Sequence, residues 1–226
     1  MMPETRFLSP AAEARLSALA REILDSDGSC HDWDHTLRVK NTALRLGEQE
    51  NADLEIVAAA AILHDIARPQ EMADQGRSDH AELGAKMAVQ LLEQEKIGDE
   101  SFRVRVAECI RTHRFRSRNG DAPATIEAKV LYDADKLDSL GAIGLARAFH
   151  FAGKTGARVH NTPAEALAGK SYGREDSALR EFLVKLRHVP EKLLTGAGRK
   201  IGAERFAYMK AFFNRLDLEC NWDRKS

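Results

Sequence analysis

Histidine and aspartate are the residues of this chain whose arrangement suggests chemistry, because imidazole and carboxylate groups together bind divalent transition metals. The chain has 8 histidines, and two of them stand directly before an aspartate, in His31-Asp32 and His64-Asp65. About 0.6 such pairs are expected by chance, so a pair alone carries little weight. The second pair follows the apolar run 56–63, where polar groups are costly to bury unless they are paired or bind a metal. The sequence therefore singles out His64 and Asp65 as candidate metal ligands.

A cluster of carboxylates lies further along the chain. Asp133, Asp135 and Asp138 fall within six residues, in a segment that is otherwise largely apolar. Buried neighbouring carboxylates repel one another and usually require a cation or a proton. The sequence therefore marks this cluster as a second candidate for cation binding, with a shared proton as the alternative.

Helices are the elements expected to position these side chains. Aromatic residues make up only 6% of the chain, with 15 glycines and 6 prolines, which disfavours a sandwich or barrel. Capping residues and apolar positions three or four apart instead predict an all-α fold of roughly nine helices. These helices are expected at 10–25, 33–50, a segment capped by Asp53, 79–95, 99–113, 124–138, 140–152, 176–194 and 200–219. We expect 68–76 to be a polar loop and 153–173 to be a long loop or a small hairpin.

Size, charge and cysteine content narrow the class of protein. The 226 residues contain no long linker, so we expect a single domain over 1–226. The 34 basic and 35 acidic residues disfavour a nucleic-acid partner and exclude a disordered acidic chain. Three widely spaced cysteines provide neither a disulfide framework nor a Cys-x-x-Cys zinc site. The longest apolar run is far shorter than the roughly 18 residues that cross a bilayer, so we expect a soluble cytoplasmic protein without a membrane partner.

The chain resembles the HD-domain metal-dependent phosphohydrolases, whose pattern is an isolated histidine, a His-Asp doublet and a distant aspartate. The matching segments are 34–39 with His35, 61–66 with His64-Asp65, and 133–138 with Asp135. The resemblance extends to small stand-alone hydrolases through 139–144, 192–195 and 198–200, and it covers about residues 15–219. It implies a helical HD-domain fold around a buried metal site, with core motifs in 30–140, C-terminal helices in 175–219, and His35, His64, Asp65 and Asp135 as ligands. Asp133 is the reserve choice for the last ligand, and Asp138 is expected to orient a neighbour.

Further residues are candidates for contact with substrate. The resemblance implies that His80 and His113 either hold a second metal, as in binuclear members, or contact phosphate as catalytic residues. Arg38 and Lys136 adjoin ligand segments and are candidates to neutralise phosphate oxygens, with simple charge balance as the alternative. His31 lies one helical turn before His35 and is an open candidate. The guanidinium groups between 111 and 118 either collect phosphate or form a solvated face; they belong to Arg111, Arg114, Arg116 and Arg118.

The resemblance implies hydrolysis of a phosphate ester or anhydride by a metal-activated water. The ion would be manganese, magnesium, iron, cobalt or zinc, with a second ion if His80 and His113 also bind one. The expected partner is a small phosphorylated molecule, preferably a nucleoside triphosphate cleaved to monophosphate and pyrophosphate. The alternatives are 5′-nucleotidase activity, cyclic-nucleotide phosphodiesterase activity, and a sensor that binds metal and nucleotide without turnover.

Overall fold

The chain folds into helices throughout the part that the structure describes. A computed structural model describes residues 7–25, 33–114 and 121–221, and none of these residues lies in a β-strand. The predicted all-α class is therefore confirmed. The chain divides into two compact units, Met1–Asp135 and Lys136–Ser226, while the single domain over 1–226 stays a prediction.

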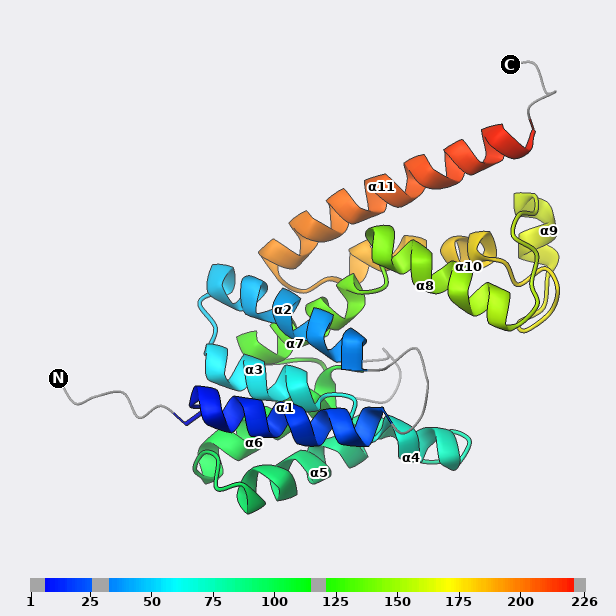
Figure 1. Ribbon diagram of the computed structural model, residues 1–226. Coiled ribbons are helices and arrows are strands. Elements are labelled where there is room, and N and C mark those ends of the chain that lie inside the picture. Colours follow the sequence, from blue (N-terminus) through cyan, green and yellow to red (C-terminus); the bar gives the residue numbers. More distant parts are fainter. Residues whose placement is uncertain (1–6, 26–32, 115–120, 222–226) are drawn as a thin grey trace. The chain divides into compact units, whose positions relative to one another are not determined.

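Among its described residues, the N-terminal unit contains six helices and most of a seventh (Figure 1). Their bounds are α1 Pro10–Leu24, α2 Trp33–Glu50, α3 Leu54–Leu63, α4 Arg68–Ala73, α5 His80–Gln94, α6 Glu100–Thr112 and α7 Ile126–Leu137. The C-terminal unit contains α8 Gly141–Lys154, α9 Pro163–Ala168, α10 Ala178–Val184, the 3-10 turns Leu186–His188 and Pro190–Lys192, and α11 Gly196–Cys220.

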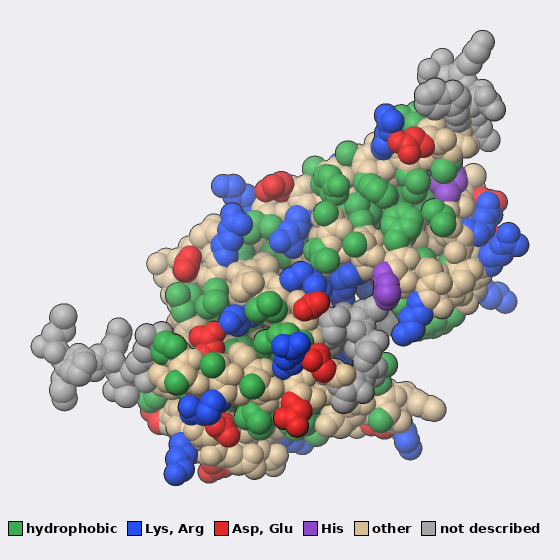
Figure 2. All heavy atoms as spheres, in the orientation of Figure 1, with side chains coloured by type: hydrophobic (Ala, Val, Ile, Leu, Met, Phe, Trp, Pro, Cys, Tyr) green, Lys and Arg blue, Asp and Glu red, His purple; other side chains and the backbone are tan. Residues whose placement is uncertain are grey.

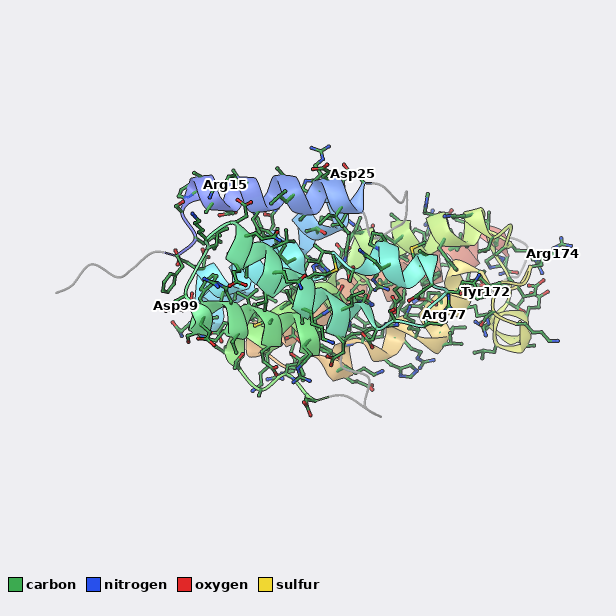
Figure 3. All side chains as sticks on the ribbon, turned by 90° about the horizontal axis from the view of Figure 1, so that it is seen from below. Arg15, Asp25, Arg77, Asp99, Tyr172 and Arg174 are labelled. Carbon is green, nitrogen blue, oxygen red and sulfur yellow. The ribbon has the colours of Figure 1, made fainter. Side chains whose placement is uncertain are left out.

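Local capping explains where three of these helices begin. The side chain of Ser9 accepts a hydrogen bond from the backbone N–H of Ala12, and Pro10 occupies the first helical position. Asp53 caps α3 in the same way, and Asp99, labelled in Figure 3, accepts from the N–H of Phe102 at 2.8 Å. Such caps satisfy backbone donors that the first helical turn leaves unpaired. Because the interaction is local, the starts of these helices were predictable to within two residues.

Helix α3 forms the centre of the N-terminal unit. Every residue from Ile56 to Leu63 is buried, and α3 packs against α1, α2 and α6. An apolar surface on all sides requires neighbours on all sides, as the sequence predicted. The residues that follow Leu63 therefore emerge inside the core rather than at its surface.

A buried carboxylate links α7 to α3 and α6. Glu127 is 7% exposed; its Oε1 accepts a hydrogen bond from the backbone N–H of Asp53 at 3.1 Å and lies 3.4 Å from Nη2 of Arg105. A buried carboxylate is stable only with such partners. This contact helps to place α7, which carries Asp135, beside the end of α3.

Helix α4 contradicts the expectation of a loop over 68–76. Pro69 stands in its first turn, where a proline is favoured because the missing N–H is not needed. The helix stops before Gln75 and Gly76, which both have positive φ angles, of 60° and 80°. Six residues are too few to display a periodic apolar pattern, so the helix was not recognised in the sequence.

Two expectations for the C-terminal unit were wrong. The helix predicted over 176–194 is α10, which ends at Val184 because Lys185 leaves the helical conformation with φ −134°, and Pro190, without an N–H, begins a separate 3-10 turn. The expected loop 153–173 contains α9, started by a reciprocal capping box between Thr162 and Glu165. Helix α11 also begins four residues early, because Thr195 caps it through the N–H of Gly198.

The exposed apolar side chains are unevenly distributed. Seven of the ten large exposed apolar residues among those described belong to the C-terminal unit: Phe151, Val159, Leu167, Tyr172, Val184, Tyr208 and Leu218. Figure 2 shows such side chains gathered on the surface of that unit. Within the described ranges, none of the helices has the length and hydropathy required to cross a membrane.

Candidate metal centre

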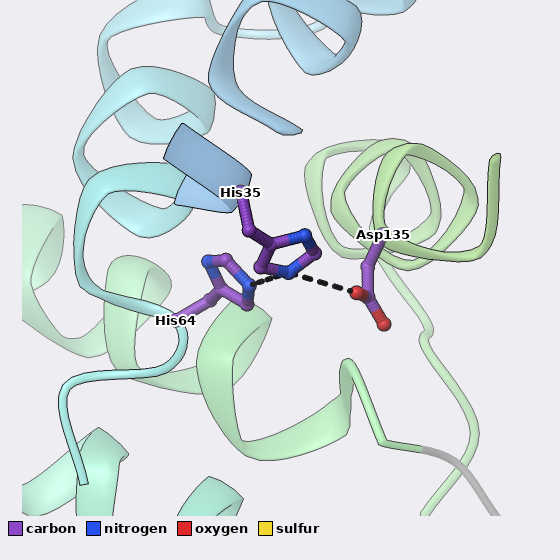
Figure 4. A group of neighbouring side chains, drawn as sticks. All are labelled: His35, His64 and Asp135. Atoms are coloured by element: carbon purple, nitrogen blue, oxygen red, sulfur yellow. Dashed lines mark hydrogen bonds and ion pairs between the residues drawn. The ribbon is translucent and has the colours of Figure 1, made fainter. Parts of the chain in front are cut away.

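The first group of potential ligands joins three helices of the N-terminal unit. His35 comes from α2, His64 ends α3 and Asp135 comes from α7, and one ligand atom of each lies within 4.8 Å of the others. The Nε2 atoms of His35 and His64 are 3.4 Å apart, and Nε2 of His35 lies 3.5 Å from Oδ1 of Asp135. Figure 4 shows the three side chains pointing toward one another. Both imidazoles are fully buried, whereas the carboxylate of Asp135 is 16% exposed.

The second group of potential ligands consists of Asp65, His80 and His113. His80 begins α5 and His113 follows the last residue of α6, and these two helices pack against each other. Their Nε2 atoms are 3.3 Å apart, and both face Oδ1 of Asp65, at 3.3 Å from His80 and 3.6 Å from His113. All three residues are buried.

Asp65 connects the two groups. While its Oδ1 faces the second group, its Oδ2 lies 3.5 Å from Nε2 of His64 and 3.7 Å from Nε2 of His35. One carboxylate therefore presents a different oxygen to each pair of histidines. The geometry is that of a carboxylate shared between two adjacent cation positions.

The ends of α3 and α6 determine the tautomers of two histidines. Nδ1 of His64 lies 2.8 Å from the carbonyl oxygen of Ala61, and Nδ1 of His113 lies 2.6 Å from that of Ile110. A carbonyl oxygen only accepts hydrogen bonds, so Nδ1 carries the proton in both rings. In a neutral ring Nε2 then presents its lone pair, which is the form that binds a metal.

Burial keeps two of these histidines neutral. It lowers the pKa of His64 to about 4, with the carboxylate of Asp65 opposing the effect only in part. Burial also lowers the pKa of His80 to about 2, against the same carboxylate. Neither ring carries a positive charge at neutral pH, so neither neutralises the carboxylates beside it.

The donor set fits divalent transition metals. Buried imidazole nitrogens and carboxylate oxygens converge at 3.3–3.7 Å, and they are electron-rich groups that a cation would bring together. Imidazole with carboxylate suits zinc, manganese, iron or cobalt, whereas calcium prefers oxygen ligands alone. The chemistry of the site is thus consistent with a cation in each group.

A charged network adjoins the second group, and sequence reasoning missed its centre. Glu71 of α4 is 8% exposed. Its Oε2 lies 2.8 Å from Nδ1 of His80 and accepts from Nη1 of Arg68 at 3.1 Å, while its Oε1 accepts a short hydrogen bond from Arg114. Nε of Arg68 also donates to Oδ1 of Asp65 at 3.2 Å. The proline after Arg68 was the one sequence signal that this segment is helical.

The other candidates have different positions. Asp133 is fully buried but belongs to neither ligand group among the described residues, whereas Asp135 does. Asp138 accepts from Nη1 of Arg147 at 2.7 Å, and its orienting role stays a prediction. Arg38 lies on α2 one turn beyond His35, and Lys136 follows Asp135 on α7; both are partly exposed.

The arginine cluster separates into distinct environments. Arg111 donates twice to Glu108, at 3.0 Å each, and pairs with Asp121 at 3.0 Å, so it belongs to a surface ion-pair network. Arg114 instead faces the charged network beside the second ligand group. Three remaining candidates lie outside the described residues: His31, Arg116 and Arg118.

Comparison with known proteins agrees with this geometry. The family model described as "HD domain" matches residues 32–140, a range that includes all six residues of the two groups. This chain belongs to the HD-domain family. It is 35% identical to the uncharacterized protein YpgQ of Bacillus subtilis over 201 residues, which cover 88% of this chain and 89% of that protein.

Solved structures place the chain among the HD-superfamily hydrolases. An HD-superfamily hydrolase from Bacillus thuringiensis matches with a TM-score of 0.72 and 30% identity, covering 95% of this chain and 98% of that one. The crystal structure of Bacillus subtilis YpgQ in complex with ADP matches with a TM-score of 0.69 and 30% identity, covering 92% and 94%. The HD-domain resemblance predicted from the sequence is confirmed.

Proposed function

We propose that this HD-domain protein is a metal-dependent phosphohydrolase. One observation carries the proposal: two groups of buried imidazoles and carboxylates share the carboxylate of Asp65. His35, His64 and Asp135 would hold one divalent ion, His80 and His113 would hold a second, and Asp65 would bind both. When bound, such ions polarise phosphoryl oxygens and lower the pKa of water.

The protein's own side chains have defined roles in this proposal. His64 and His80 are neutral because they are buried, so they act as ligands without losing a proton first. Asp65 balances positive charge on both sides, and Arg68 orients one of its oxygens. Arg38 and Lys136, on the helices that carry His35 and Asp135, are proposed to neutralise phosphate oxygens.

The proposed substrate is a nucleotide, preferably a nucleoside triphosphate cleaved to monophosphate and pyrophosphate. The support is that the related YpgQ of Bacillus subtilis has been crystallised with ADP, together with the family membership of the chain. A relative crystallised with ADP favours the nucleotide class. Nucleotidase and cyclic-phosphodiesterase activity are the alternatives within that class.

The test is a nucleotide panel assayed with manganese, magnesium, cobalt, iron, zinc or no metal. Phosphate and pyrophosphate are quantified separately, because pyrophosphate release identifies triphosphate cleavage and phosphate release from monophosphates identifies a nucleotidase. We expect metal-dependent release from at least one nucleotide, abolished by His64→Ala. Conversion of a cyclic nucleotide to its monophosphate, which releases neither product, is followed separately by chromatography and identifies a phosphodiesterase. Tight nucleotide binding with none of these three products from the metal-loaded protein would contradict catalysis and identify a sensor.

A further inference from the structure

Glu71 is a buried carboxylate beside the candidate centre. Three side chains converge on it: Arg68 from the same helix, His80 from α5, and Arg114, which follows α6. Oε2 accepts from Arg68 and Oε1 accepts from Arg114, so both oxygens of this carboxylate serve as acceptors. The residue lies in a segment that the HD-domain pattern leaves without an assigned role.

The contact with His80 determines which ring nitrogen is protonated. Oε2 of Glu71 lies 2.8 Å from Nδ1, whereas Oδ1 of Asp65 lies 3.3 Å from Nε2. The shorter contact with an acceptor favours the proton of the neutral imidazole on Nδ1, between that atom and Glu71. Nε2 is left with its lone pair, directed at Oδ1 of Asp65 and at Nε2 of His113.

Unlike His64 and His113, His80 has no helix-end carbonyl within hydrogen-bond distance of its Nδ1 among the described residues. It begins α5 instead of following a helix, and carbonyls left unpaired by a helix lie at the opposite end. The orientation of its ring therefore depends on a side chain. Glu71 supplies for His80 the acceptor that Ala61 and Ile110 supply for the other two rings.

We propose that Glu71 is a positioning residue, which holds His80 in the Nδ1–H tautomer so that Nε2 is available as a ligand in the second group. This inference rests on the proposed metal-dependent function, but its central statement concerns the metal-free protein. Ligand histidines commonly require an acceptor on the second nitrogen, and loss of that acceptor typically lowers metal affinity by about 10- to 100-fold.

Arg114 determines what happens when Glu71 is removed. Its Nη1 lies 3.1 Å from Nδ1 of His80, close enough to donate to that atom if it loses its proton. In Glu71→Ala the guanidinium becomes the nearest partner, and a guanidinium only donates. The proton of His80 is then expected on Nε2, which would abolish its lone pair toward Asp65.

The direct test is imidazole nitrogen NMR of metal-free protein labelled with 15N at histidine, with the His80 signals assigned through His80→Gln. We expect the Nδ1–H tautomer in the wild type and the Nε2–H tautomer in Glu71→Ala. Glu71→Gln retains an acceptor oxygen and should restore the wild-type pattern. Glu108→Gln is the matched control, because Glu108 likewise accepts two guanidinium hydrogen bonds, both from Arg111, and its carboxylate has no recorded contact with a ligand residue. An Nε2–H tautomer in the wild type would overturn the proposal, without the need for any variant.

A calorimetric titration with Mn²⁺ supplies the second readout. We expect two ions per wild-type chain, one of which binds about 10- to 100-fold more weakly in Glu71→Ala and recovers in Glu71→Gln. If both ions bind to Glu71→Ala as tightly as they bind to the wild type, the positioning role is overturned. Failure of the wild type to bind Mn²⁺ or another divalent metal would instead contradict the proposed function, and the tautomer in the metal-free protein would still decide the role of Glu71.

Discussion

Replacing Asp65 with asparagine tests whether one carboxylate serves two metal positions. The substitution preserves size but removes the negative charge and one of the two acceptor oxygens. In the wild type, Oδ1 lies 3.3 Å from His80 and 3.6 Å from His113, and Oδ2 lies 3.5 Å from His64 and 3.7 Å from His35. An amide has a single oxygen, so at least one group must face an NH₂ donor that cannot bind a metal.

The expected effect can be expressed as thermal stabilisation by metal. An ion present at about 100 times its Kd stabilises the folded state by about 2.7 kcal/mol. For a chain of this length, that corresponds to an increase in Tm of roughly 5–11 °C for one ion and about twice as much for two independent ions. Asp65→Asn should reduce the increase to half or less.

The assay compares Tm with added Mn²⁺ against Tm with chelator, alongside metal content by elemental analysis. Asp135→Asn should weaken only the ion held with His35 and His64, and His113→Gln only the other ion. Asp176→Asn is the carboxylate control, since Asp176 pairs with Arg180 and belongs to neither ligand group, and it should retain both ions. If Asp65→Asn binds two ions with an unchanged increase in Tm, the shared-carboxylate reasoning is refuted.

Three further predictions concern residues around the site. Glu127→Ala removes the acceptor for the N–H of Asp53 and should lower the free energy of unfolding, measured by urea denaturation, by about 1–3 kcal/mol. A change within experimental error would show that this buried contact does not hold α7. Burial raises the pKa of the Cys109 thiol to about 12. At pH 8, iodoacetamide should therefore modify exposed Cys220 but not Cys109, as measured by peptide mass spectrometry. Rapid labelling of both cysteines would contradict the burial of Cys109. Arg111→Ala should change KM for the hydrolysed nucleotide less than about twofold, because Arg111 forms ion pairs with surface carboxylates. A tenfold rise in KM would instead indicate that Arg111 binds phosphate.

Local interactions explain what the sequence predicted about the fold. Ser9, Asp53 and Asp99 satisfy donors two or three residues away, so each helix start is encoded within a few positions. The interior location of α3 was also predictable, because a helix that is apolar on all sides requires neighbours on all sides. Helix α4 and the break after α10 were missed, because a short helix has no period to detect and a 3-10 turn resembles helix in its pattern.

Some features of the candidate site were likewise predictable from the sequence, whereas others depend on the tertiary structure. The types of its residues, and the doublet at the end of an apolar helix, were visible in the sequence and predicted metal chemistry. The proximity of Asp135 to His35 and His64, the position of Asp65 between two pairs of histidines, and the contact of Glu71 with His80 depend on tertiary structure. His35 and Asp135 are separated by 100 positions and meet only because the tertiary structure brings α2 and α7 to the same site, since no local rule relates side chains on different helices.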